Sequence, residues 1–216
     1  SDLTLRPQVG ARPASILMTL EGTINPMRQH AAYREIEHLP LAERKAKLLD
    51  REFRQRILSE EKVLPRSKDA VRMMNNYDTI WVMDESLSYE PSEADSVAAI
   101  AAANQQDPME VVMDTMAKGT PLLVLFGRYA GNLEGQRELI EDPRSVFGLS
   151  DGGAHCGVLV DASVPTYMLT YFSRDRQRGP TMSPEFIVHK MTRDTAELYG
   201  LHDRGLLQAG FKADLN

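Results

Sequence analysis

Cysteine is nearly absent from this chain of 216 residues, whose only thiol is that of Cys156. A single cysteine excludes an internal disulfide and favours a reducing compartment. No stretch approaches the roughly 20 apolar residues that span a bilayer. The first residues also lack the apolar run of a signal peptide. We therefore expect a soluble, cytoplasmic protein that has no membrane partner.

Positive charge is also scarce, because 25 Lys and Arg residues face 31 Asp and Glu residues, which gives a formal net charge of −6. Such a chain has no broad basic field, so nucleic acid is not an expected partner. The composition, with 42% hydrophobic and 26% charged residues, is ordinary for a globular protein with a sizeable core. The eleven methionines are expected to fill that core.

Local metal-binding motifs are missing as well. The patterns H-x-H, H-E-x-x-H and C-x-x-C do not occur, and His30, His38, His189 and His202 are dispersed along the chain. The sequence therefore offers no zinc site made from one such motif.

What the chain does have is short apolar runs that alternate with helical patterns. Four runs predict buried strands, over residues 15–20, 79–83, 121–126 and 145–149. Amphipathic or capped patterns predict helices within residues 41–63, 92–103, 108–119, 135–141, 162–172 and 183–199. Continuous apolar strands that alternate with helices are typical of a parallel α/β sheet. The last stretch, residues 205–216, has alternating apolar positions that suggest a short returning strand.

The densest group of reactive residue types is the segment 148–156, GLSDGGAHC, which directly follows the fourth apolar run. In parallel α/β sheets chemistry collects at the C-terminal ends of strands, so Asp151 is the leading catalytic candidate. A carboxylate there binds a metal ion or accepts a proton from metal-bound water. Gly152 and Gly153 let the backbone approach a ligand. His155 remains open between a metal ligand, a substrate contact and an ordinary loop residue.

Two further residues carry weaker signals. Cys156 could be a soft ligand, although a lone thiol is more often a small buried apolar side chain. Arg128 follows the third apolar run and could hold a substrate anion, although exposed arginines are common. Arg128 is therefore kept as a candidate substrate contact.

The same segment permits a different chemistry. Residues 148–152 fit the G-x-S-x-G nucleophile elbow, with Ser150 as nucleophile and with Asp175 and His202 in the order of a serine hydrolase. An elbow leads directly into a helix, whereas the glycines after Ser150 predict a loop. No His-Gly-Gly motif precedes it to supply an oxyanion hole. A serine esterase is therefore the alternative to a metal-dependent site.

Residues 147–155 resemble the last barrel strand of the N-acyl-D-amino-acid deacylase branch of the amidohydrolase superfamily. Residues 191–215 resemble the closing motif of that superfamily, in which the chain leaves the barrel and enters a small β-sandwich. Residues 95–108 resemble one of its barrel helices. The resemblance implies the C-terminal half of a (β/α)8 barrel over residues 1–204, with the start of the return to a β-sandwich over residues 205–216.

This resemblance also implies a chemistry. It is the hydrolysis of a small-molecule amide with one or two zinc ions, in which the residue matching Asp151 deprotonates the metal-bound water and then protonates the leaving nitrogen. Asp151 is also a candidate metal contact. The arginine that holds the carboxylate of a D-amino acid in this branch has no counterpart in residues 157–162.

The other metal ligands of the superfamily have no match in the chain. The resemblance therefore predicts the C-terminal portion of a longer enzyme, which would be inactive alone. We expect such a piece to associate with a second copy or with its N-terminal half, because an incomplete barrel exposes strand edges and apolar faces.

Overall fold

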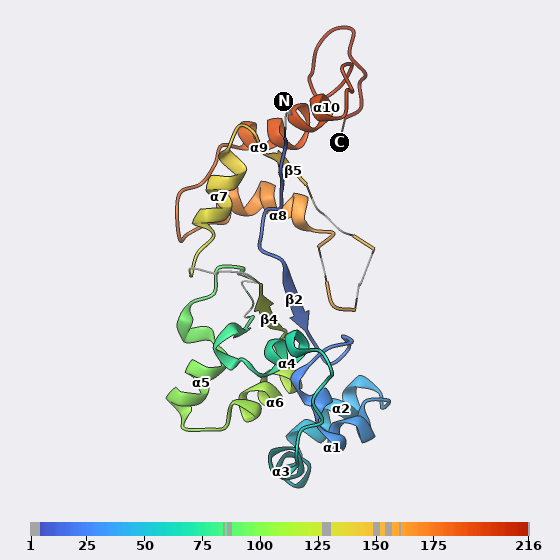
Figure 1. Ribbon diagram of the computed structural model, residues 1–216, viewed down its shortest axis with the longest axis vertical. Helices are drawn as coiled ribbons and strands as arrows, with labels where there is room; N and C mark the ends of the chain where they lie inside the picture. Colours follow the sequence, from blue (N-terminus) through green and yellow to red (C-terminus); the bar gives the residue numbers. More distant parts are fainter. Residues whose placement is uncertain are drawn as a thin grey trace. The chain divides into compact units, whose positions relative to one another are not determined.

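The computed structural model describes residues 5–83, 85, 88–126, 131–148, 152–153, 157–159 and 161–215. The chain divides into two compact units (Figure 1). Unit 1 consists of residues 1–13, 132–154 and 161–216, and unit 2 consists of residues 14–131 and 155–160. Unit 2 is therefore inserted, in sequence, between two parts of unit 1. No helix of the described residues is long and apolar enough to cross a membrane.

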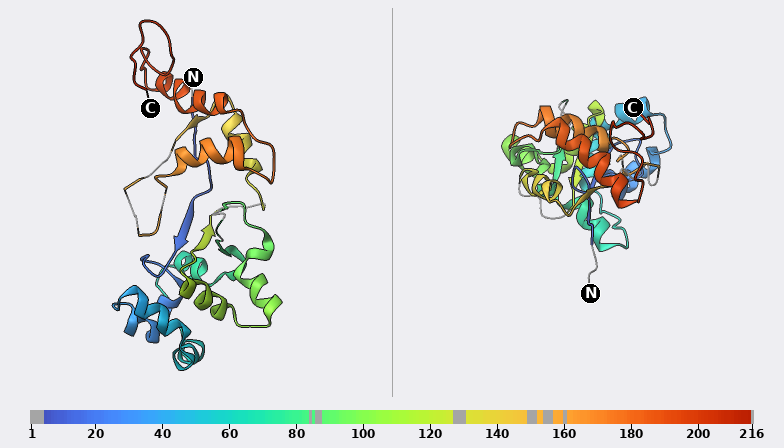
Figure 2. Two further views of the ribbon diagram at one scale, coloured as in Figure 1. Left: turned by 180° about the vertical axis from the view of Figure 1, so that it is seen from behind. Right: turned by 90° about the horizontal axis from the view of Figure 1, so that it is seen from above.

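Unit 1 is built on a short parallel pair of strands. Strand β1 (Gln8–Val9) pairs with β5 (Val146–Phe147), so that the N-terminal strand lies beside a strand from much later in the chain (Figure 2). The helices among the described residues of the unit are α7 (Glu134–Glu141), α8 (Val164–Thr170), α9 (Pro184–Met191) and α10 (Arg193–Leu198). A π-helical turn, Tyr171–Asp175, continues α8. Both α9 and α10 contact β5.

Unit 2 has a three-stranded antiparallel sheet with the order β2-β4-β3. Its strands are β2 (Ser15–Met18), β3 (Ile80–Val82) and β4 (Leu122–Leu125). Its helices are α1 (Ala31–Ile36), α2 (Leu41–Leu49), α3 (Arg51–Ser59), α4 (Lys68–Asn75), α5 (Val97–Asn104) and α6 (Pro108–Lys118). Three 3-10 turns join them: η1 (Pro26–Gln29), η2 (Tyr77–Thr79) and η3 (Glu93–Asp95).

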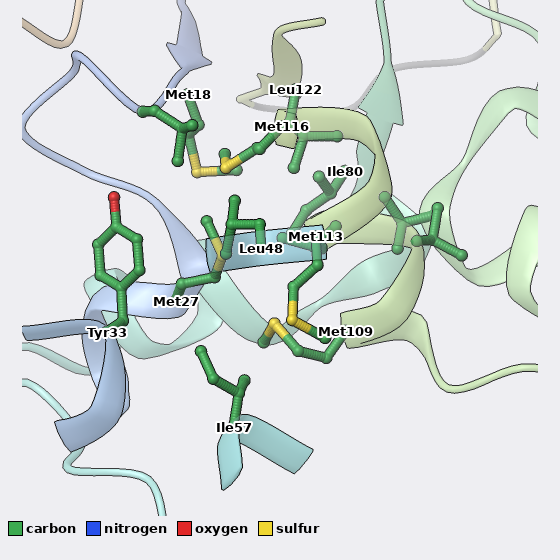
Figure 3. Packing of buried hydrophobic residues seen from close by; sticks show 14 of the residues in the cluster. Met18, Met27, Tyr33, Leu48, Ile57, Ile80, Met109, Met113, Met116 and Leu122 are labelled. Atoms are coloured by element: carbon green, nitrogen blue, oxygen red, sulfur yellow. The ribbon is translucent and has the colours of Figure 1, made fainter. Parts of the chain in front are cut away.

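Methionine side chains fill much of the core of unit 2, as the composition predicts. Figure 3 shows several of them in one cluster with aliphatic side chains. The buried members are Met18, Met27, Met109, Met113 and Met116, none more than 3% exposed. The flexible thioether side chain adapts to irregular gaps between helices, which explains this use. These methionines are structural.

The helix boundaries follow the capping residues in the sequence. Asp50 caps α3 by accepting a hydrogen bond from the Phe53 amide (2.9 Å), which divides the expected helical region 41–63 into two helices. A capping box headed by Asp107 begins α6, and Gly119, with φ of 88°, ends it. Ser183 caps α9, as its sequence pattern predicts. The expected limits of α6 and the expected start of α9 are confirmed, whereas the expected helix over residues 183–199 is divided into α9 and α10.

Two expectations about strands are wrong. Strands β2, β3 and β4 lie where the apolar runs place them, but they pair antiparallel rather than parallel. An apolar run reports that a strand is buried on both faces and carries no information about its direction. Residues 205–215 form turns, bends and irregular backbone and no strand. The backbone hydrogen bonds there, from the Phe211 amide to the Gln208 carbonyl and from the Lys212 amide to the Asp203 carbonyl, close local turns rather than a strand ladder.

The described residues form a mixed α/β structure without a closed barrel. The half-barrel therefore remains a prediction, as does the division at residue 205.

Candidate functional site

The leading site candidates lie outside the described residues. They are Asp151, His155 and Arg128, together with Ser150 and Cys156 of the alternative interpretations. Gly152 and Gly153 are described and form an exposed turn. Gly153 has φ of +117°, a conformation that favours glycine, and a Cβ built there would meet no atom within 4 Å. The contacts of the described residues within and beside the segment 149–160 are given next.

The segment starts from the parallel strand pair of unit 1. The Gly148 amide donates a hydrogen bond to the Val9 carbonyl (3.1 Å) at the C-terminal end of β5. A Cβ at Gly148 would lie 2.9 Å from the Cβ of Gln8, so the close approach of the two strands requires glycine. The segment with the candidate residues thus leaves the C-terminal end of a parallel strand, where α/β proteins usually place their chemistry.

A buried ion pair holds the chain where the segment re-enters unit 1. The Arg12 guanidinium lies 3.0 Å from the Asp161 carboxylate, with side-chain exposures of 3% and 20%. Arg12 also lies over the ring of Tyr167, 5.7 Å from its centroid. Asp161 is therefore held by a partner from the opposite end of the chain, 149 residues away in sequence.

A third contact lies within unit 2. The Gly157 carbonyl accepts hydrogen bonds from the Thr23 amide (2.9 Å) and the Thr23 hydroxyl (3.2 Å). Thr23 belongs to the loop that follows β2. Val158 and Leu159 pack against the apolar core of the same unit. The described residues Gly157, Val158 and Leu159 are thus part of unit 2.

A buried lysine supports the turn that leads into β5. Lys190 of α9 is 3% exposed, and its ammonium group donates to the carbonyls of Asp142 (2.9 Å) and Ser145 (2.8 Å). It also lies 3.5 Å from the Asp194 carboxylate. Sequence reasoning missed this residue. In the sequence, Lys190 stands three residues after Ile187, so both side chains lie on the same face of the helix. This spacing is the feature that could have identified Lys190 as buried.

The acidic groups of unit 1 near this turn carry low pKa values. The guanidinium of Arg144, with its amide, holds the pKa of Asp142 at about 2. The hydrogen bond from Arg137, and a second from Arg176, lower the pKa of Glu134. The low pKa values make both carboxylates weak bases, whereas a general base works best when its pKa lies near the operating pH.

The sequence pattern that defines the amidohydrolase family matches residues 5–216 of the chain. The chain belongs to the amidohydrolase family. Searches of curated proteins and of solved structures return no match. Membership implies hydrolysis of C–N bonds, and members typically depend on a metal ion. The match is to the family as a whole, so the deacylase branch remains a finer hypothesis.

The described residues of this amidohydrolase do not make a metal centre. Among them, no group of three or more His, Cys, Asp or Glu side chains lies close enough to hold an ion. A tight zinc site needs three or four such donors. No catalytic step through a metal ion is derived from this part of the chain.

The local backbone also bears on the alternative serine chemistry. Gly152 and Gly153 form a turn, and none of the described residues between Gly152 and Ser163 is helical. The next helix, α8, begins only at Val164. A nucleophile elbow leads directly from its serine into a helix. Both the turn and the family of the chain therefore favour the amidohydrolase interpretation over Ser150.

Proposed function

We propose that this amidohydrolase hydrolyses a small-molecule amide and that Asp151 is its general base and acid. Asp151 would take a proton from the attacking water and return it to the leaving nitrogen, so that an amine departs rather than an amide anion. The observation that supports this most directly is the frame around the segment 149–160. Its first neighbour, Gly148, is bonded to Val9, and its last, Asp161, is bonded to Arg12.

The frame matters because acid–base catalysis needs a group within hydrogen-bond reach of the reacting atoms. Gly148 and Asp161, the described residues on either side of the segment, are each bonded to the N-terminal part of unit 1. Defined positions for flanking residues favour the preorganisation that catalytic groups require.

The remaining candidates are assigned to the substrate. We propose that His155 and the backbone of Gly152 and Gly153 contact the amide, and that Arg128 holds an anionic group of the substrate. Zinc would supply Lewis-acid chemistry when bound, and Asp151 is a residue of this chain that would contact it. Ligands from outside this chain would complete the site, either from an N-terminal half or from a second copy.

The test is an amine-release assay on the full-length natural protein, supplied with zinc and with a panel of N-acylated amines, including N-acyl amino acids of both configurations. We expect release of free amine that a chelator abolishes and that Ser150→Ala retains. Hydrolysis lost in Ser150→Ala and unaffected by the chelator would instead support the serine esterase. The configuration preferred would decide the deacylase branch.

A further inference from the structure

A pocket lies within unit 2, and all of its lining residues are described. One wall comes from the loop after β2, from η1 and from α1, and the other comes from the stretch 63–65 and from α4. The volume of the pocket is about 280 Å³. Ligand pockets usually have volumes of roughly 300–1,000 Å³, so this pocket has room for a small ligand.

Most of the wall is apolar. Its apolar members are Ile24, Val63, Pro65, Ala70, Met73 and Met74. Met74 is 7% exposed, whereas Val63 remains 51% exposed. An apolar group of a ligand would remove the exposed part of this wall from water, and the flexible side chains of the two methionines adapt to its shape. The wall therefore favours a ligand with a short alkyl or aryl group.

The charged members of the lining are two arginines, Arg28 and Arg34, and no Asp or Glu is among the described residues that line the pocket. Arg28 donates to the Thr23 carbonyl (2.5 Å) and pairs with Glu37 (3.2 Å).

Arg34 is engaged differently, because its Nε group donates to the Arg28 carbonyl (2.9 Å), while no contact with the described residues occupies its two terminal nitrogens. Arg34 therefore offers an oriented guanidinium group, whose fork binds a carboxylate through two parallel hydrogen bonds.

Hydrogen bonds join the two walls before any ligand binds. The Val63 amide donates to the Gln29 carbonyl (2.7 Å), which links the stretch 63–65 to η1. The side-chain amide of Asn75, at the end of α4, donates to Oε1 of Gln29 (2.9 Å), and Lys62 donates to Oδ1 of Asn75 (3.0 Å). A preformed pocket loses less conformational entropy when its ligand binds.

We propose that this pocket binds a small amphipathic carboxylate, with its apolar group against α4 and its carboxylate on Arg34. The apolar wall discriminates against acids without an apolar group, such as acetate. The guanidinium discriminates against amines that carry the same apolar group. None of the candidate catalytic residues lines the pocket, so this inference does not depend on the proposed function.

Calorimetric titration of the full-length protein with octanoate, an eight-carbon carboxylate, tests the proposal. We expect octanoate to bind and acetate and octylamine to bind much more weakly or not at all. Arg34→Gln should raise the Kd for octanoate at least about tenfold, because a hydrogen bond to a charged group is lost. Arg72→Gln is the matched control, since it removes an exposed arginine of α4 that does not line the pocket, and its Kd should equal that of the wild type.

Methionine labelled with ¹³C in its methyl group shows where octanoate binds. We expect the methyl signals of Met73 and Met74 to shift during the titration, while those of the core residues Met109 and Met113 stay in place. Ala70→Leu adds bulk to the wall of the pocket and should abolish these shifts.

Three results would overturn the proposal: no binding of octanoate to the wild type, equal Kd values for the wild type and Arg34→Gln, or equal binding of octylamine. Shifts confined to methionines outside the pocket would also overturn it. If Ala70→Leu does not fold, Arg34→Gln still decides, because the Arg34 side chain is exposed and its removal leaves the core intact. Asp151→Asn should bind octanoate like the wild type, so the failure of the proposed function and the failure of this proposal are distinguishable.

Discussion

At the scale of single residues, the frame of the site depends most on Arg12. Its side chain is 3% exposed and its guanidinium is paired with Asp161 at 3.0 Å. Removing one member of a buried pair leaves the other charge buried without compensation. Loss of either partner of this pair should therefore lower the free energy of unfolding of unit 1.

Arg12→Met tests this contribution. We expect the free energy of unfolding to fall by about 3–5 kcal/mol, because the Asp161 carboxylate loses its partner. Chemical denaturation monitored by circular dichroism measures the change. Arg174→Ala is the matched control, since the Arg174 side chain is 73% exposed and forms an ion pair with its neighbour Asp175. Equal stability of Arg12→Met and Arg174→Ala would contradict the assigned role.

Asp151 could be predicted as a candidate from the sequence, whereas the roles of Arg12 and Lys190 could not. Asp151 is conspicuous because it follows an apolar run and is surrounded by glycine, both local properties. The partnership of Arg12 with Asp161, and that of Lys190 with the Asp142–Ser145 turn, joins residues 149 and 45–48 positions apart. No local pattern records such pairs, because they exist only after the chain has folded.

At the scale of elements, α9 supports β5 through Lys190. Its ammonium group satisfies two carbonyls in the turn that precedes the strand. Lys190→Met keeps a long apolar stem but removes the donor. The Asp142 carbonyl keeps the Ser145 amide as a donor (3.0 Å), whereas the Ser145 carbonyl loses the lysine. We therefore expect a loss of about 1–3 kcal/mol, measured by thermal unfolding. Lys118→Met, at the exposed end of α6, is the control, and an equal effect of the two changes would count against this role.

The elements also show what a sequence pattern leaves open. Helix limits were predictable because caps such as Asp107 and Ser183 act on the first turn of their own helices. Strand positions were predictable from apolar runs. Strand direction was not, because β2 and β4 pair across more than 100 residues and their burial is the same in either orientation. Helices α1 and α4 were not predicted, although Ser67 caps α4 by accepting a hydrogen bond from the Ala70 amide (3.3 Å).

At the scale of the whole molecule, the stability of unit 2 should depend on pH through His30. Burial lowers the pKa of His30 below its ordinary 6.5, Lys62 lowers it further, and Glu60 and Asp107 oppose the shift. As pH falls, the unfolded chain therefore binds a proton before the folded one does. The contribution of His30 is complete above about pH 6.5 and declines below it.

Unfolding of unit 2 at pH 7.5 and pH 5.5 measures this effect. We expect the wild type to be less stable at pH 5.5 and His30→Gln to show a much smaller difference between the two values. The matched control is His189→Gln, which removes a histidine with a 55% exposed side chain from unit 1 and should leave the pH dependence of unit 2 unchanged. Equal pH dependence in wild type and His30→Gln would refute the assignment.

The central claim is that Asp151 moves the proton in amide hydrolysis, and the kcat of Asp151→Asn in the full-length, zinc-supplied protein tests it most directly. Asparagine keeps the size of the side chain but cannot accept the proton from water, so turnover should fall at least about a hundredfold while the circular dichroism spectrum is unchanged. Ser150→Ala should retain activity in the same assay. A folded Asp151→Asn protein with near-normal kcat would contradict the account.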